Sequence, residues 1–137
     1  MKKLGLDLGN RTLGIAVSDE LNFLARGLET FRFEDSEFLL ALEHTKSLIK
    51  LYNIDVVVLG HPKNMDGTSG EQAKISENFK KDLEEQVSVK VVLWDERLTS
   101  RMANNMMISQ NLKQKNRKKD IDKMAATIIL QGYLDSL

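Results

Sequence analysis

Three acidic positions have surroundings that suit chemistry better than ordinary protein surface does. The first is Asp7, which stands in an apolar stretch and shares its face with Gly5 and Gly9, because strand residues alternate sides. Glycines leave room for close approach, and an acid in so apolar a strand needs a partner. We therefore expect Asp7 to bind an ion or a phosphate. The alternative is a carboxylate that accepts a hydrogen bond from a nearby backbone N–H.

The second position follows the apolar run Val89–Trp94, where Asp95 and Glu96 are adjacent. Open α/β sheets bind ligands at the carboxyl ends of their strands. Because adjacent strand residues face opposite sides, only one of these acids can point towards Asp7, and the spacing leaves the choice open. The other acid would pair with Arg97 or cap the next helix.

The third position is Asp122, at the start of the last apolar-periodic segment. Residues at helical spacing behind it form a mostly apolar stripe: Ala125, Ala126, Ile129 and Tyr133. A carboxylate at the head of this stripe should face the sheet. The alternative is an N-terminal acid favoured by the helix dipole, a role that suits Asp120 better because we expect Asp120 to be the N-cap.

Carboxylates brought together from two strands and a helix would form a site for hard cations. The chain has no cysteine and only two histidines, far apart in sequence, so oxygen ligands dominate and select Mg²⁺ or Mn²⁺. Two such ions about 3.5–4 Å apart stabilise the attacking and leaving oxygens of a phosphodiester displacement. The three acids therefore predict a two-metal-ion nuclease. The alternative is a nucleic-acid-binding module without catalysis, in which the acids do not meet.

The charges balance overall but are unevenly distributed. There are 20 basic and 20 acidic side chains, giving zero net charge. Residues 97–119 nevertheless contain no acid, whereas acids outnumber bases in residues 18–45. A strongly basic side favours a polyanionic partner such as nucleic acid; the alternative is a solvated lysine-rich segment. We expect residues 113–119 to form a basic loop. The phosphate-binding residues expected there are Lys115, Arg117 and Lys118.

The loop over residues 60–70 offers a second phosphate site. It links the end of a strand to the start of a helix, whose free N–H groups bind anions. Side chains that could add donors are Lys63, Asn64, Thr68 and Ser69. The alternative is a structural turn at residues 66–67. Further candidates for phosphate contacts are Arg11 and Arg97. We interpret His61 as polar surface and leave it out of the catalytic set.

The elements that position these residues follow from hydrophobic periodicity. Alternating or continuous apolar runs predict five strands, over residues 3–9, 12–18, 25–33, 56–60 and 89–94. Helical spacing predicts four helices, over residues 38–52, 70–85, 99–111 and from Asp120 onwards. Ser36 is the expected N-cap of the first helix, and Ser69 with Gln72 fits a capping box for the second.

This order is a meander of three strands, followed by alternating helices and strands. It predicts one α/β domain over residues 1–137, with a mixed five-stranded sheet in which the meander precedes βαβ units and helices cover both faces. This is the outline of the ribonuclease H-like architecture. A similar hairpin opens actin-like ATPases, which we set aside because they need a second nucleotide-binding domain. The amino terminus lacks the apolar core of a signal peptide, so we expect a cytoplasmic protein with no membrane anchor.

Four segments make the sequence resemble the YqgF family, also called RuvX. They are GLDLGNRTLGIAVSD (5–19), VVLGHPKNMDGTSGEQA (57–73), VVLWDERLTSRMA (91–103) and KKDIDKMAATIILQGYL (118–134). The resemblance implies a ribonuclease H-like fold similar to that of RuvC resolvases. It also implies that the acidic triad is Asp7, Glu96 and Asp122, which selects Glu96 over Asp95. Two positions depart from the pattern of many members: Thr12, often arginine, and His61, often apolar.

The activity implied by the resemblance is that of a hydrolase acting on ester bonds. The family is thought to trim the 5′ end of precursor 16S ribosomal RNA in ribosome biogenesis, so we expect structured RNA as the substrate. The alternative is Holliday junction resolution on branched DNA. In either case the triad would hold Mg²⁺ or Mn²⁺, and we expect a monomer or a weak homodimer.

Overall fold

The computed structural model describes residues 1–62, 70–95 and 114–137, and within residues 114–120 it describes the backbone only. The strands are β1 (Lys2–Leu8), β2 (Thr12–Ser18), β3 (Ala25–Arg32), β4 (Ile54–His61) and β5 (Lys90–Asp95). The helices are α1 (Phe38–Tyr52), α2 (Glu71–Gln86) and α4 (Gln114–Asp135). The expected helix over residues 99–111 lies outside the described residues.

The strands form a five-stranded mixed sheet in the order β3-β2-β1-β4-β5. β1, β2 and β3 pair antiparallel, and β4 pairs parallel with both β1 and β5. The predicted meander followed by βαβ units is therefore confirmed. The parallel pairing with β4 places β1 in the middle of the sheet, where an acid on β1 has strands on both sides.

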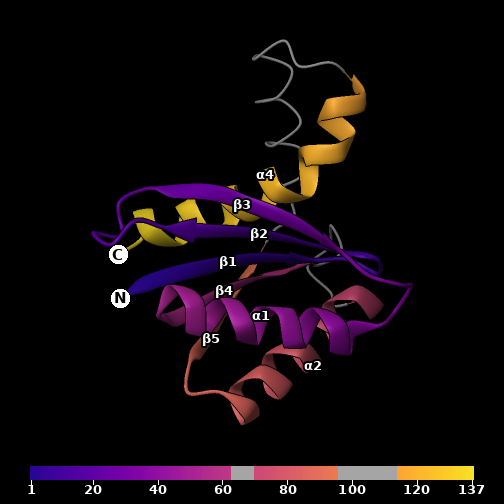
Figure 1. The fold of residues 1–137 in the computed structure, drawn as a ribbon, viewed down its shortest axis with the longest axis horizontal. Helices are drawn as coiled ribbons and strands as arrows, with labels where there is room; N and C mark the ends of the chain where they lie inside the picture. The colour runs from indigo at the N-terminus through magenta and orange to yellow at the C-terminus, as the bar shows by residue number, and fades with distance from the viewer. Residues whose placement is uncertain (63–69, 96–113) are drawn as a thin grey trace.

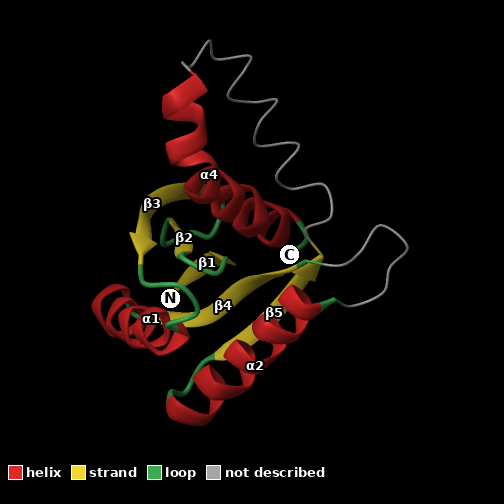
Figure 2. Cartoon of the chain, turned by 90° about the vertical axis from the view of Figure 1, so that its right-hand side faces the viewer, coloured by secondary structure: helices red, strands yellow, loops and turns green. Residues whose placement is uncertain are grey.

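Helices cover both faces of the sheet, as predicted (Figure 1). Figure 2 shows α1 and α2 on one face and α4 on the other. The alternation of β1 explains the division. Leu4, Leu6 and Leu8 are buried in the larger apolar cluster, with buried residues of α1 and α2. Gly5 faces the other way, and a Cβ atom there would lie 2.7 Å from Cβ of Leu130 on α4. Asp7 follows Gly5 by two residues and therefore lies on the α4 face.

The α4 face of the sheet carries a smaller apolar cluster, rich in alanine. Its buried members are Ala16, Val58, Ala126, Ile129, Leu130 and Leu134, with Trp94 and Tyr133 packed against them. The rings of Trp94 and Tyr133 meet edge to face, with centroids 6.1 Å apart. Small residues on both sides let the helix lie close to the strands. The helix backbone therefore reaches the strand residues that carry the candidate site.

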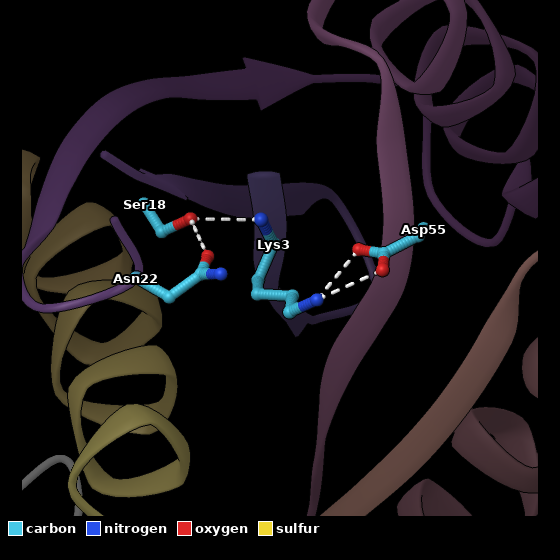
Figure 3. Close-up of polar contacts among 4 residues, drawn as sticks. All are labelled: Lys3, Ser18, Asn22 and Asp55. Atoms are coloured by element: carbon cyan, nitrogen blue, oxygen red, sulfur yellow. Dashed lines mark hydrogen bonds and ion pairs between the residues drawn. The ribbon is translucent and has the colours of Figure 1, made fainter. Parts of the chain in front are cut away.

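An ion pair stabilises the end of β1 that lies away from Asp7 (Figure 3). Lys2 pairs with Ile54 and Lys3 with Val56, so Asp55 is an extra residue in β4. Nζ of Lys3 lies 2.8 and 2.9 Å from the two carboxylate oxygens of Asp55. The backbone N–H of Lys3 also donates to Oγ of Ser18 at 2.8 Å. The bulge thus supplies the carboxylate that a half-buried lysine needs.

The N-terminal ends of three helices differ from the prediction. Ser36 is not the N-cap of α1: it has a left-handed φ of 64° and Glu37 is the N-cap. The N-cap of α2 is Gly70. Ser69, which we expected to form a capping box with Gln72, lies outside the described residues. The side chain of Gln72 donates instead to the carbonyl oxygen of Leu8, at 3.3 Å. This hydrogen bond ties the first turn of α2 to the end of β1.

The third correction concerns α4, which begins at Gln114 and not at Asp120. The expected basic loop is therefore helical from residue 114 onwards, and Asp120 is not an N-cap. Lysine, arginine and glutamine are good helix formers, so the helix extends ahead of its apolar stripe. None of the described helices is long and apolar enough to cross a membrane.

Candidate functional site

Asp7 lies near the carboxyl end of β1 on the α4 face. It is half-buried and is paired across the sheet with Gly14 of β2. Because Gly14 has no side chain, an element that packs on this face of β2 can come close to the strand beside Asp7. The element that packs there is α4, which lies against β2, β3 and β1.

Asp122 is the residue of α4 that occupies this space. A Cβ atom at Gly14 would lie 2.1 Å from the carbonyl oxygen of Asp122, so only glycine allows this approach. On the same face of β2, the hydroxyl of Thr12 donates to Oδ2 of Asp122 at 2.9 Å. Asp7 and Asp122, which are far apart in sequence, therefore lie beside the same glycine, near the carboxyl end of β1.

The stripe behind Asp122 holds the helix in this position. Ala125, Ala126 and Ile129 are buried, with exposures of 1%, 0% and 0%. The prediction that Asp122 heads an apolar stripe facing the sheet is confirmed. The next residue, Lys123, lies over β3: its Cγ would be 2.7 Å from a Cβ atom at Gly27. Glycines in two neighbouring strands thus allow this turn of α4 to lie close to the sheet.

The turn between β1 and β2 carries the candidate phosphate ligand Arg11. Its ends are joined by a hydrogen bond from the N–H of Gly9 to the carbonyl oxygen of Thr12, at 2.8 Å. The carbonyl oxygen of Arg11 accepts from the N–H of Phe33 at 2.9 Å. The Arg11 side chain itself is 76% exposed and lies 3.9 Å from Asp35. The backbone is thus fixed beside the two carboxylates while the guanidinium faces solvent.

Asp95, the first of the two adjacent acids considered for the site, is the last residue of β5. Trp94 packs on the α4 face, next to Gly132. Asp95 follows Trp94 and shares the parity of Leu93, which belongs to the cluster under α1 and α2. Its pairing partner is His61 of β4. Asp95 therefore lies on the opposite face from Asp7. Glu96 lies outside the described residues.

His61 differs from the exposed polar residue that we expected. Its side chain is only 13% exposed, and Nε2 lies 3.0 Å from Oε2 of Glu77 on α2. This contact joins the end of β4 to α2 on the face opposite to Asp7. The residue therefore links two elements and lies away from the carboxylate pair.

Several predicted site residues fall outside the described part of the chain. They are Lys63, Asn64, Thr68, Ser69, Glu96 and Arg97. Lys115, Arg117 and Lys118 lie in the first turns of α4, whose backbone continues directly into Asp122. Figure 2 shows these turns extending beyond the sheet. The basic segment and the carboxylate thus belong to one helix.

The donor set at this edge suits a hard cation. Among the residues that the structure describes, no group of three or more histidine, cysteine or acidic side chains could hold a metal. What the described residues supply is a pair of carboxylates, Asp7 and Asp122, with the Thr12 hydroxyl bonded to the second. Oxygen donors of this kind fit Mg²⁺ or Mn²⁺ and do not fit a soft metal.

The sequence analysis did not predict how two residues build the site: the hydrogen bond of Thr12 to Asp122 and the packing of Gly14 against the backbone of Asp122. A glycine in the interior of an apolar strand signals close approach by another backbone, and Gly14 is such a residue. Thr12 carried no comparable signal, because its partner lies 110 residues away. Only the packing of α4 on β2 brings the two together.

Comparison with known proteins finds similarity along the whole chain. The family model RuvX, described as Holliday junction resolvase, matches residues 1–136. A Bacillus subtilis protein named "Putative pre-16S rRNA nuclease" is 53% identical over 137 residues, covering 100% of this chain and 99% of the relative. A protein of the same name from Geobacillus thermodenitrificans is 49% identical over 136 residues, covering 99% of each chain.

Two solved structures that match this fold over nearly their full length are Holliday junction resolvases. The fowlpox virus Holliday junction resolvase superimposes with a TM-score of 0.61 at 19% identity, covering 100% of both chains. Thermus thermophilus RuvC gives a TM-score of 0.62 at 14% identity, covering 99% of this chain and 95% of RuvC. At these identities the likeness establishes the fold, which is the predicted ribonuclease H-like one.

Proposed function

The chain belongs to the RuvX family, and from this membership we propose that it is a metal-dependent nuclease that processes the 5′ end of precursor 16S ribosomal RNA. The observation that carries the proposal is the 53% identity, over essentially the full length of both chains, to a relative named as a pre-16S rRNA nuclease. The chain is a hydrolase acting on phosphodiester bonds.

The catalytic carboxylates in this proposal are Asp7, Glu96 and Asp122. The placement of Asp7 and Asp122 beside Gly14 supports the first and third of these assignments. The parity of Asp95, which puts it on the opposite face, supports the choice of Glu96. A bound Mg²⁺ or Mn²⁺ would supply charge stabilisation at the phosphate and a more acidic attacking water.

The remaining proposed residues bind and orient the nucleic acid. Arg11 has an exposed side chain in the turn between β1 and β2 and is suited to contact a backbone phosphate. The other residues proposed to contact phosphates are Lys63, Asn64, Thr68, Ser69, Arg97, Lys115, Arg117 and Lys118. Such contacts fix the register of the substrate on the protein but carry no base specificity.

A second candidate function is the resolution of Holliday junctions in branched DNA. The description of the matching family model favours it, as does the fold shared with resolvases across their whole length. A symmetric junction has two strands to cut, so this function needs two active sites. We propose a monomer or a weak homodimer in the cytoplasm, with nucleic acid as the partner in either case.

The test is cleavage of precursor 16S ribosomal RNA and of a four-way DNA junction, side by side, with Mg²⁺ or Mn²⁺. We expect cleavage of the RNA at its 5′ precursor end. Asp7→Asn, Glu96→Gln and Asp122→Asn should each abolish cleavage and leave the fold intact. Asp95→Asn is the matched control, because its carboxylate lies on the other face, and it should cleave like the wild type.

Each outcome of this experiment decides between the candidates. Cleavage of the junction alone would replace the ribosomal substrate with branched DNA. Binding of both nucleic acids without cleavage of either would favour a non-catalytic binding module. A triad variant with wild-type turnover at saturating metal would remove that residue from the site.

A further inference from the structure

We propose that Thr12 is a positioning residue that orients the Asp122 carboxylate for a divalent metal ion. This inference rests on the proposed function, because it assumes that Asp122 is a metal ligand. The observation behind it is the hydrogen bond from Oγ1 of Thr12 to Oδ2 of Asp122, 2.9 Å long. In the described part of the chain it is the only hydrogen bond that the Asp122 side chain makes.

The donor is held rigidly before any metal binds. Thr12 is the first residue of β2, and its carbonyl oxygen closes the β1–β2 turn by accepting from the N–H of Gly9 at 2.8 Å. Its backbone is also paired with Arg32 of β3. Threonine is branched at Cβ and therefore restricted about χ1. The hydroxyl thus has little freedom except rotation of its own proton.

The acceptor is fixed in its backbone but not in its side chain. The close approach of Gly14 to the carbonyl group of Asp122 fixes where the α-carbon lies. The side-chain torsions are then the remaining freedom, and the hydrogen bond from Thr12 selects one arrangement. Because that bond engages Oδ2, Oδ1 would be left to coordinate a metal ion. Groups that orient a metal ligand in this way typically change metal affinity or activity about 10–100-fold when removed.

The arrangement also fixes the relation between the two carboxylates. Asp7 is paired with Gly14, two residues after Thr12 on β2. One strand therefore carries the hydroxyl that holds Asp122 and the glycine that lies beside Asp7. Thr12 acts on the metal site through Asp122 and is a positioning residue in this role.

The experiment compares Thr12→Val, which keeps the shape but removes the hydroxyl, with Thr12→Ser, which keeps the hydroxyl. Thr127→Val is the matched control, since it removes a threonine hydroxyl from α4 that donates to the carbonyl oxygen of Lys123. Two quantities are measured. One is Mn²⁺ binding to the protein without nucleic acid, by electron paramagnetic resonance of free Mn²⁺. The other is the separate kcat and KM for cleavage at each Mn²⁺ concentration.

We expect Thr12→Val to weaken Mn²⁺ binding about 10–100-fold and to raise the metal concentration for half-maximal kcat equally. KM for the nucleic acid should stay unchanged at saturating metal. Thr12→Ser and Thr127→Val should both resemble the wild type. Valine suits the start of a strand, so melting should be nearly unchanged; Thr12→Ala serves in its place if the valine variant does not fold.

Two results would overturn the inference. One is wild-type Mn²⁺ binding and kcat in Thr12→Val; the other is an equal reduction in Thr127→Val, which would show a general disturbance of α4. Asp122→Asn separates this failure from failure of the proposed function. If Asp122→Asn binds Mn²⁺ and cleaves like the wild type, Asp122 is not a ligand and this inference falls, whereas loss of cleavage by the wild-type protein itself would be needed to overturn the proposed nuclease.

Discussion

At the scale of single residues, the site depends on a side chain that is missing. Gly14 lies opposite Asp7 on the neighbouring strand and directly beneath the backbone of Asp122. Any larger residue would separate the helix from the sheet at the point where the backbone of Asp122 lies over β2. The close approach of β2 and α4 therefore requires glycine for packing, independently of any conformational freedom.

We predict that Gly14→Ala destabilises the protein by about 1–3 kcal/mol and abolishes cleavage, because an added Cβ 2.1 Å from the Asp122 carbonyl oxygen forces α4 away. Urea denaturation and a cleavage assay measure the two effects. The stability control is Gly9→Ala, whose Cβ would lie 3.4 Å from Oγ1 of Thr12, an ordinary contact. Equal stability of the two variants would contradict the packing argument.

At the scale of secondary-structure elements, α4 combines three tasks. It covers one face of the sheet, carries Asp122, and continues ahead of Asp122 into a basic segment. Lys115 precedes Asp122 by seven residues, which corresponds to about 10 Å of helix. A phosphate held by the basic turns would therefore be positioned relative to the carboxylate by a continuous helix.

We predict that replacing Lys115, Arg117 and Lys118 by glutamine weakens binding about equally for all nucleic-acid sequences. For every phosphate that these side chains no longer neutralise, the slope of log affinity against log salt should flatten by about 0.7–0.9. Turnover of bound substrate should fall less than affinity. Fluorescence anisotropy at several salt concentrations measures the slope.

The matched control replaces three lysines on the opposite side of the sheet, Lys50, Lys80 and Lys81 of α1 and α2, by glutamine. This variant should keep the wild-type slope. If the α4 variant also keeps it, the nucleic acid does not follow α4, and the path along Lys63 and Arg97 becomes the better proposal.

The regular elements of the fold were predictable from the sequence, whereas features created by long-range packing were not. β1 and β2 were predicted to within one residue because their alternation is strict, and α1 because its apolar spacing is regular. The start of α4 was predicted wrongly, since its first turns have no apolar periodicity and owe their helicity to propensity and to the docked turns that follow. The placement of Asp7 and Asp122 on one face was predictable from strand parity and helical spacing. The hydrogen bond from Thr12 was not, because long-range packing creates it.

At the scale of the whole molecule, the zero net charge is the sum of an acidic region and a basic region. Acidic side chains at one edge of the sheet repel a polyanion, and the basic turns of α4 attract it. In the proposed mechanism a divalent cation would resolve this conflict, because it would bind the carboxylates and the phosphate oxygens together. Metal and nucleic acid should therefore bind cooperatively.

We predict that Mn²⁺ binds weakly to the free protein and more tightly when product RNA is present, since phosphate oxygens complete its coordination. Titration of free Mn²⁺ with and without RNA measures the difference, after subtraction of Mn²⁺ bound by RNA alone. Excess chelator should abolish cleavage, and added Mg²⁺ or Mn²⁺ should restore it. Full cleavage in excess chelator would exclude the metal-dependent mechanism.

The two apolar clusters on opposite faces of the sheet have a consequence for the order in which parts of the protein unfold. The cluster under α1 and α2 is large and contains all three leucines of β1, whereas α4 is held by a smaller layer that includes two buried alanines. Undocking of α4 exposes less apolar surface than global unfolding does, so it should need less free energy. Asp122 leaves the sheet with it.

Inactivation should therefore precede unfolding. We expect the amides of α4 to exchange with deuterium faster than those of β1 and β4 under native conditions, and cleavage to disappear at a urea concentration at which the sheet is still intact. Equal protection of α4 and β1 would mean that the two layers open as one cooperative unit. Because the proposed catalytic carboxylate Asp122 lies on the less firmly held layer, loss of activity should be the most sensitive sign that the native state is opening.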